Sequence, residues 1–234
     1  LRTPPPVSTD RVLFSNENKR DGVDLAARYS NYFGNWDLGL SIFHGVSREP
    51  RLVQSLMPGA TELLPLYDEI TQAGLELQYT QDALLLKFEG IVREGQGDTF
   101  AASVAGLEYT LYQVFEKSWD LGLLAEYLYD GRSDDPFLTP AGVTTEVPVT
   151  PFENDIFIGS RLAFNDFQDS ALLAGAIIDA DDQSTALFLE AARRLGQNWK
   201  LEAESRLFLD IEQGNTLSAF AQDDFLNIRL ARYF

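Results

Sequence analysis

Cysteine is absent from this sequence of 234 residues, which excludes disulfide bonds, thiolate catalysis and cysteine-based zinc sites. Histidine occurs once, at His44, so metal sites built on two histidines are also excluded. Cations are scarce: 18 Lys and Arg stand against 36 Asp and Glu, a formal net charge of −18. Nucleic-acid binding needs a basic surface to displace counterions from phosphates, so we expect no nucleic-acid partner. No residue pattern calls for a cofactor.

Long apolar runs are also missing, because no segment approaches the about 20 consecutive apolar residues of a transmembrane helix. Membrane-spanning strands give no such run, since their side chains alternate between an apolar outside and a polar inside. The composition suits strands: 16 Phe and 9 Tyr occur beside a single Met. The sequence therefore favours an all-β protein.

Alternation with period two recurs along most of the chain. In 199–211 the residues WKLEAESRLFLDI sort Trp, Leu and Ile onto one face and Lys, Glu, Arg and Asp onto the other. This sorting indicates a strand, because a helix would scatter these charges around its circumference. Eleven segments, most of them near the roughly ten-residue length of a tilted membrane strand, show the pattern. They are 22–33, 36–46, 69–80, 83–93, 99–113, 119–130, 155–165, 170–179, 184–195, 199–211 and 224–234.

Short and long connections alternate between these segments. The short turns are 33–35, 80–82, 115–118, 165–169 and 196–198. The long connections are 47–68, 131–154 and 212–223, with 94–98 and 179–183 the shortest of that set. Outer-membrane barrels have short periplasmic turns and longer extracellular loops. On that assignment Phe234 lies at the periplasmic end.

An internal repeat places the three tryptophans at equivalent positions. Asn35-Trp36-Asp37-Leu38-Gly39-Leu40 recurs as Ser118-Trp119-Asp120-Leu121-Gly122-Leu123 and as Asn198-Trp199-Lys200-Leu201-Glu202-Ala203. Each Trp begins a predicted strand directly after a short turn. Tryptophan is enriched at membrane interfaces, so Trp36, Trp119, Trp199 and Phe234 are expected to form an aromatic girdle. The alternative is three core tryptophans in a soluble β-protein.

With these features the chain resembles a Gram-negative outer-membrane β-barrel of the porin-like kind. The terminal strand ends in Leu230, Arg232 and Phe234, similar to the alternating apolar C-terminal assembly signal of such barrels. Arg232 departs from that pattern, although a long cation near the interface can snorkel. The resemblance implies an antiparallel up-and-down transmembrane barrel in the bacterial outer membrane, in contact with lipid and lipopolysaccharide.

This chain is expected to supply about 11–12 strands of a larger barrel. Bacterial barrels have even strand numbers with both termini in the periplasm, so at least one strand should precede residue 21. Residues 1–21 are predicted to be a polar, Pro-rich loop or a poor strand over 7–17. Residues 22–234 hold the barrel strands.

Charged residues of both signs share the inward parity of the strands. We predict that they line a pore: Arg28, Glu76, Lys87, Glu89, Glu108, Glu126, Arg161, Glu190, Arg194, Lys200, Glu202, Glu204, Arg206 and Arg229. Such groups tune ion or solute selectivity in a water-filled pore. In a narrow barrel they would instead form a salt-bridge network that closes the lumen.

Three further features have a structural and a functional interpretation. His44 beside Ser41 or Ser47 would suit a hydrolase, but its outward parity favours a surface histidine, so no enzyme activity is expected. The acidic loops 130–135 and 179–182 suit calcium or simply solvent. Loop 47–68, rich in Leu, is expected to fold into the lumen or to pack on another subunit or loop.

The sequence thus predicts a channel that passes small polar solutes or ions. One alternative is a structural or assembly barrel with an occluded lumen that holds a partner protein or forms an oligomer. Another is a secreted soluble β-sandwich, in which the apolar parity would be buried between two sheets.

Overall fold

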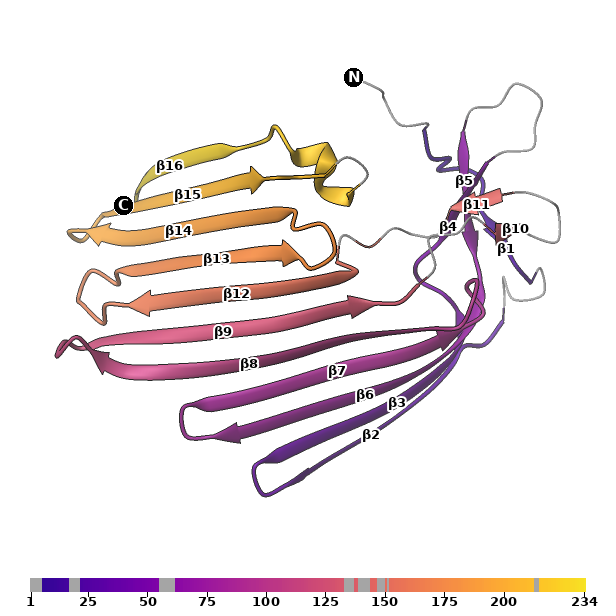
Figure 1. The fold of residues 1–234 in the computed structure, drawn as a ribbon, viewed down its shortest axis with the longest axis horizontal. Helices are drawn as coiled ribbons and strands as arrows, with labels where there is room; N and C mark the ends of the chain where they lie inside the picture. The colour runs from indigo at the N-terminus through magenta and orange to yellow at the C-terminus, as the bar shows by residue number, and fades with distance from the viewer. Residues whose placement is uncertain are drawn as a thin grey trace.

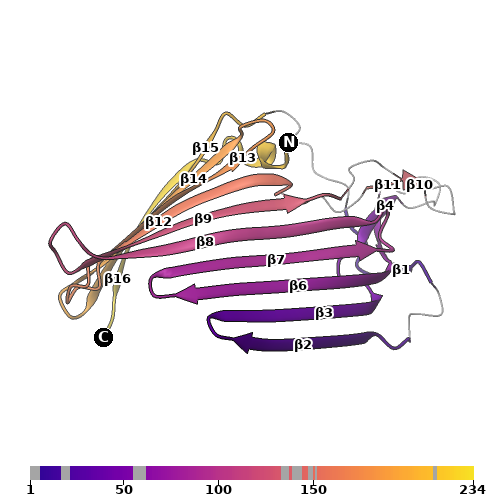
Figure 2. The ribbon, with the colours of Figure 1, turned by 60° about the horizontal axis from the view of Figure 1, so that its bottom comes forward.

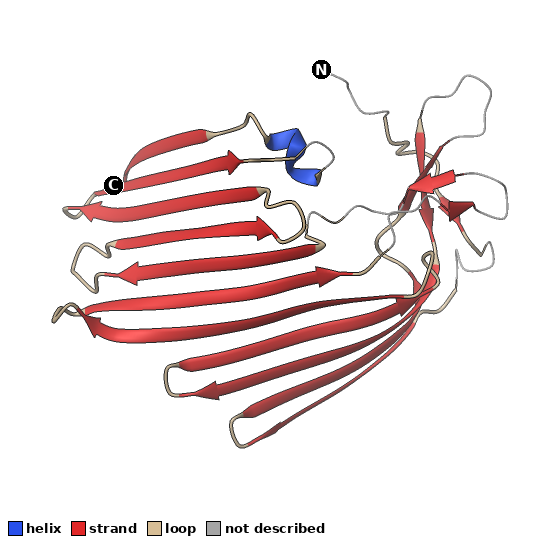
Figure 3. Cartoon of the chain, in the orientation of Figure 1, coloured by secondary structure: helices blue, strands red, loops and turns tan. Residues whose placement is uncertain are grey.

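The computed structural model describes residues 6–16, 22–54, 62–132, 137–138, 144–146, 150, 152–212 and 215–234. These residues form strands, turns and one short 3-10 helix, η2 (Thr216–Phe220), as Figure 3 shows. No other helix occurs in the described part of the chain. The predicted all-β class is confirmed.

Eleven strands form one antiparallel sheet in the order β16-β15-β14-β13-β12-β9-β8-β7-β6-β3-β2. They are β2 (Leu25–Phe33), β3 (Trp36–Val46), β6 (Glu69–Gln81), β7 (Leu84–Glu94), β8 (Phe100–Val114), β9 (Trp119–Asp130), β12 (Asn154–Ala163), β13 (Ala171–Asp179), β14 (Thr185–Leu195), β15 (Trp199–Leu209) and β16 (Phe225–Arg232). Every segment predicted from alternation corresponds to one of these strands. The up-and-down order is also confirmed.

The large sheet is open. The described residues do not form the predicted closed barrel, because β2 and β16 each pair on one side only. Figures 1 and 2 show the sheet twisting and curling between these two edges, which lie on opposite sides of the molecule. An edge strand presents unpaired N–H and C=O groups that another strand can use.

The connections separate the two ends of the sheet. The short turns and Phe234 gather at one end, here called the turn end (Figure 1). The longer connections gather at the opposite end, here called the loop end. At the loop end Gly95 has a φ of +98°, and a Cβ there would lie 2.2 Å from the carbonyl oxygen of Glu69. Only glycine fits this tight turn between β7 and β8.

A second sheet of five short strands lies at the loop end (Figure 1). Its order is β1 (Leu13–Phe14), β5 (Leu63–Tyr67), β4 (Arg51–Gln54), β11 (Thr144–Glu146) and β10 (Phe137–Leu138). The segments 47–68 and 131–154, predicted as loops, therefore contain strands. The predicted poor strand over 7–17 is not part of the large sheet, because Leu13 and Phe14 pair in parallel with β5.

The small sheet holds the buried apolar cluster of the described residues, formed by Val53, Leu64 and Leu66. Beside it, Arg51 and Asp68 are 4% and 1% exposed, and Arg51 Nη2 donates a 2.6 Å hydrogen bond to Asp68 Oδ1. Leu64 and Leu66 of segment 47–68 are thus buried within the β4–β5 hairpin. Their burial there explains why this connection is apolar.

Candidate functional site

The strand register separates the side chains of the large sheet into two faces. The face that carries Trp36, Trp119 and Trp199 is called the apolar face, and the opposite one the polar face. On the apolar face Leu40 lies beside Leu75, and Leu189 lies beside Ala174. Within the described strands, the Asp, Glu, Lys and Arg side chains on this face are Glu69, Glu94, Arg193 and Arg232. All four lie near a strand end, which leaves an uncharged band between them.

This apolar band is uncovered. Leu40, Ile158 and Leu189, each near the middle of its strand, are 45%, 49% and 46% exposed. Soluble monomers rarely expose contiguous apolar patches of more than a few hundred Å². No second sheet of the described residues covers the band, since the small sheet lies at the loop end.

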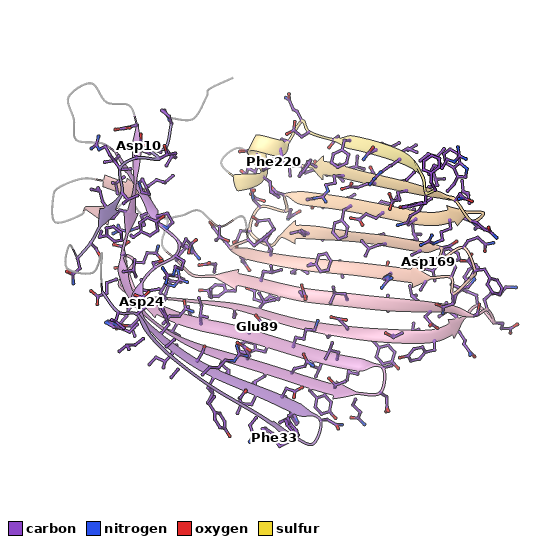
Figure 4. The ribbon with its side chains drawn as sticks, turned by 180° about the vertical axis from the view of Figure 1, so that it is seen from behind. Asp10, Asp24, Phe33, Glu89, Asp169 and Phe220 are labelled. Atoms are coloured by element: carbon purple, nitrogen blue, oxygen red, sulfur yellow. The ribbon has the colours of Figure 1, made fainter. Side chains whose placement is uncertain are left out.

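All the predicted pore-lining residues lie on the polar face. Arg28, Ser41 and Gly74 form one cross-strand row, and neighbouring rows hold the others. Figure 4 labels Glu89 near the middle of the sheet, away from Phe33 and Asp169 at the turn end. The structure therefore brings these residues together on one surface.

Some of these charges are paired across or along the strands. Arg28 pairs with Glu76 and Lys87 with Glu108. Lys200 Nζ lies 2.7 Å from Glu202 Oε1, and Arg206 Nη2 lies 3.1 Å from Glu204 Oε1. Arg229 Nη1 is 3.7 Å from Glu202 Oε2.

Other charges on this face have no ion-pair partner among the described residues. They are Glu89, Glu126, Arg161, Glu190 and Arg194. Five aspartates near the strand ends also lie on the polar face: Asp37, Asp120, Asp130, Asp155 and Asp179. Carboxylates thus outnumber cations on the polar face.

A network at the loop end escaped the sequence prediction. Arg93 Nη1 donates to Glu49 Oε2 at 3.1 Å and Arg132 Nη1 donates to Glu49 Oε1 at 3.0 Å. Gln96, 3% exposed, donates to the Glu49 carbonyl at 2.7 Å, and both guanidinium groups lie over the Phe100 ring. This network ties the connection after β3 to β7 and β9. Arg93 has inward parity, so its place on the polar face was readable from the pattern.

The predicted aromatic girdle has close neighbours at the turn end. Trp36 lies 4.9 Å from Tyr79 and Trp119 lies 4.8 Å from Phe164, measured between ring centroids. The Arg232 guanidinium lies 5.5 Å from the Trp199 ring and 4.7 Å from the Phe234 ring. Arg232, the departure from the terminal pattern, is thus held between two aromatic rings.

We predict that Arg232→Ala loosens the terminal strand. A cation–π contact at an exposed site contributes about 0.5–1 kcal/mol. Amide hydrogen exchange in β16 should therefore become roughly two- to fivefold faster. Arg229→Ala on the polar face of the same strand is the control and should change exchange less. Equal effects of the two variants would contradict the role of the rings.

His44 is placed on the apolar face, as its parity predicted. Its Nδ1 lies 3.1 Å from Thr71 Oγ1 and its Nε2 lies 3.0 Å from Glu69 Oε1. Ser41 faces the opposite side of the sheet. The described contacts of His44 therefore include no serine.

The acidic loop after β13 is organised by hydrogen bonds. Asp179 Oδ1 accepts from the backbone N–H groups of Asp181 and Asp182. Asn215 Nδ2 donates to Asp179 and to Asp182, each at 2.9 Å, while Asn215 Oδ1 caps η2 through Leu217 N–H. Hydrogen bonding from Ser184 holds the pKa of the Asp182 carboxyl below its usual value. This loop positions η2.

Calcium binding finds limited support in these acidic loops. Asp155, the cross-strand partner of Asp179, is buried, and its Oδ2 has no hydrogen-bond partner among the described residues. Yet no three of the described His, Cys, Asp and Glu side chains are arranged to hold a metal ion. In the other acidic loop Asp130 pairs with Arg132, while residues 133–136 lie outside the described part.

No described helix has the length and hydropathy needed to cross a membrane. Comparison with known proteins adds no relative. No family model, curated protein or solved structure matches this chain.

Proposed function

We propose that the chain forms part of a transmembrane β-barrel in a bacterial outer membrane and that its polar face lines a channel for small polar solutes or ions. The observation that carries this proposal is the separation of side chains over eleven strands. One face is apolar, uncovered and free of charge near its middle, while the other carries the charges. Lipid on one side and water on the other would satisfy both faces.

The open edges fit the same proposal. A membrane barrel must be closed, because unpaired backbone groups in hydrocarbon cost several kcal/mol each. The edges β2 and β16 would therefore pair with further strands to complete a wider barrel than eleven strands can form. The lipid and lipopolysaccharide contacts would fall on the apolar face, with Trp36, Trp119 and Trp199 at the periplasmic interface.

An occluded structural barrel is the second candidate. The ion pairs of Arg28, Lys87 and Arg206 favour it, because paired charges can seal a lumen rather than conduct through it. The unpaired residues Glu89 and Glu126 favour the channel, since their carboxylates are available to passing cations.

Conductance across planar lipid bilayers tests the channel directly. Because carboxylates outnumber cations on the polar face, the open channel should prefer cations. Glu126→Gln should lower the cation-to-anion permeability ratio roughly two- to fivefold, since one unit charge about 4 Å from an ion in water is worth about 1 kcal/mol.

Glu116→Gln is the matched control, because Glu116 lies in the turn between β8 and β9 rather than on the polar face. It should leave the permeability ratio unchanged. Folded protein inserted in the bilayer without conductance would support the occluded barrel. Equal shifts in the two variants would refute the assignment of Glu126 to the channel wall.

A further inference from the structure

One part of the polar face is apolar. At the loop end a hollow of about 530 Å³ is lined by Phe152, Ile177, Ala186, Leu187, Phe188, Glu204, Arg206, Phe208, Leu217, Phe220, Asp223 and Phe225. Five of these residues are phenylalanines. Ligand pockets for small molecules typically have volumes of roughly 300–1,000 Å³ and apolar walls with a few polar groups. This hollow has the size and lining of such a pocket.

The walls of the hollow come from two parts of the fold. The β14 and β15 side chains Phe188 and Phe208 form its floor, on the polar face of the large sheet. The helix η2 forms the opposite wall, where Phe220 stacks on Phe208 with ring centroids 6.1 Å apart. Figure 4 shows Phe220 at η2, beside the loop end of the strands. Phe220 and Phe225 are 50% and 39% exposed, so a ligand can reach them.

The wall formed by η2 is held in place. Asn215 caps the helix and also donates to the acidic loop through Asp179 and Asp182. In the segment that follows the helix, Asp224 Oδ1 accepts a 2.7 Å hydrogen bond from Phe208 N–H. The aromatic walls are therefore pre-organised, which lowers the ordering cost of binding.

The charges of the lining select among apolar ligands. Arg206 is already paired with Glu204, at 3.1 Å, so its charge is neutralised. The carboxylate of Asp223 has no hydrogen bond or ion pair among the described residues. The faces of phenylalanine rings are electron-rich and attract cations. The lining thus offers flat apolar surface and one available negative charge.

We propose that this hollow is a binding site for a planar aromatic cation. The ligand ring lies against Phe220 and Phe188, and its positive charge lies near Asp223. This site is independent of conduction, because binding at equilibrium does not require that the barrel transport anything.

Fluorescence polarisation with three dyes tests the proposal on the folded full chain in detergent. The probes are acridine orange, a planar cation; N-phenyl-1-naphthylamine, which is uncharged; and 8-anilinonaphthalene-1-sulfonate, an anion. Empty micelles measured at the same detergent concentration give the background. Acridine orange should bind saturably with one site per chain, and at least tenfold more tightly than the anionic dye. Absence of saturable binding above the micelle background would overturn the site.

Variants separate the aromatic and charged contributions. Phe220→Ala should weaken binding of acridine orange roughly five- to tenfold, because it removes one stacking wall. Asp223→Asn should weaken acridine orange and leave the uncharged dye unchanged. Asp210→Asn is the control in the same connection, since Asp210 does not line the hollow. Equal binding by all variants, or tighter binding of the anionic dye, would refute the proposal.

Circular dichroism of each variant confirms that its strands are formed, so a loss of binding is not a loss of fold. Bilayer conductance is measured on the same preparations. Dye binding without conductance would leave this site standing and refute only the channel. Conductance without dye binding would refute the binding site and leave the channel standing.

Discussion

Replacing Leu189 by arginine is expected to destabilise the protein by about 2–4 kcal/mol when it is folded in a lipid bilayer. Leu189 lies near the middle of β14 on the apolar face and is 46% exposed. On the proposed membrane location, an arginine there leaves water for hydrocarbon, at a cost that is greatest near the bilayer midplane. Urea titration of the protein in vesicles should show the folding equilibrium constant reduced roughly 30- to 700-fold.

Leu173→Arg is the matched control for Leu189→Arg. Leu173 lies at nearly the same depth, because its partner on β14 is Glu190, the neighbour of Leu189. Its side chain, however, points to the polar face, where an arginine can pair with Glu190. We expect a change of less than about 1 kcal/mol for this exposed charge pair. Equal destabilisation by the two substitutions would show that the apolar face does not contact lipid.

Replacing Asp68 by asparagine should have a second large effect, this time on the small sheet. The substitution removes the negative charge of Asp68 from beside the buried Arg51 guanidinium. Removal of one partner from a buried ion pair costs about 3–5 kcal/mol. Hydrogen exchange in β4 and β5 should therefore become more than a hundredfold faster, while exchange in β14 and β15 stays unchanged.

Arg48→Gln is the comparison for the Asp68 variant. Arg48 pairs with Asp24 at 2.9 Å, but its side chain is 82% exposed. Exposed ion pairs contribute about 0–1 kcal/mol to stability, so Arg48→Gln should change amide hydrogen exchange several-fold at most. The double variant Arg51→Met with Asp68→Leu should recover most of the lost stability, since an apolar pair of similar size avoids the desolvation cost. If the double variant does not recover stability, the Arg51–Asp68 ion pair supplies a specific geometry that an apolar pair cannot replace.

The large sheet was predictable because alternation is a local property. In β15 the charges Lys200, Glu202 and Glu204 occupy every second position, and only an extended chain places them on one face. The same rule gave the polar-face residues, since parity within a strand decides the face. The ends of strands depended on turn geometry, and β2 begins at Leu25 rather than at residue 22.

The small sheet could not be predicted in the same way. Its strands are two to five residues long, too short for alternation to be recognised. Its pairings are also remote in sequence: Thr145 pairs with Val53, and Leu13 pairs with Leu66. The leucines of segment 47–68 indicated burial, but the sequence pattern did not show that Leu64 and Leu66 pack with Val53 in one hairpin.

The aromatic hollow was missed for a different reason. Phe188, Phe208 and Phe225 have the inward parity of their strands, so the pattern places them on the polar face. Their apolar rings among charged neighbours, however, give no local signal of a hollow. The contribution of η2 was not visible at all, because it depends on the contact of Asn215 with a loop more than 30 residues away.

The strand order of the large sheet determines how further hairpins can be added to it. Trp36, Trp119 and Trp199 each open the second strand of a hairpin, in β2–β3, β8–β9 and β14–β15. Because every strand touches only its neighbours in the order, a duplicated hairpin extends the sheet without disturbing any other pairing. Copying two strands at a time also preserves the direction of the chain and the placement of each face. The recurring Trp-containing hairpin is therefore a unit that can be repeated along the sheet without exchanging its two faces.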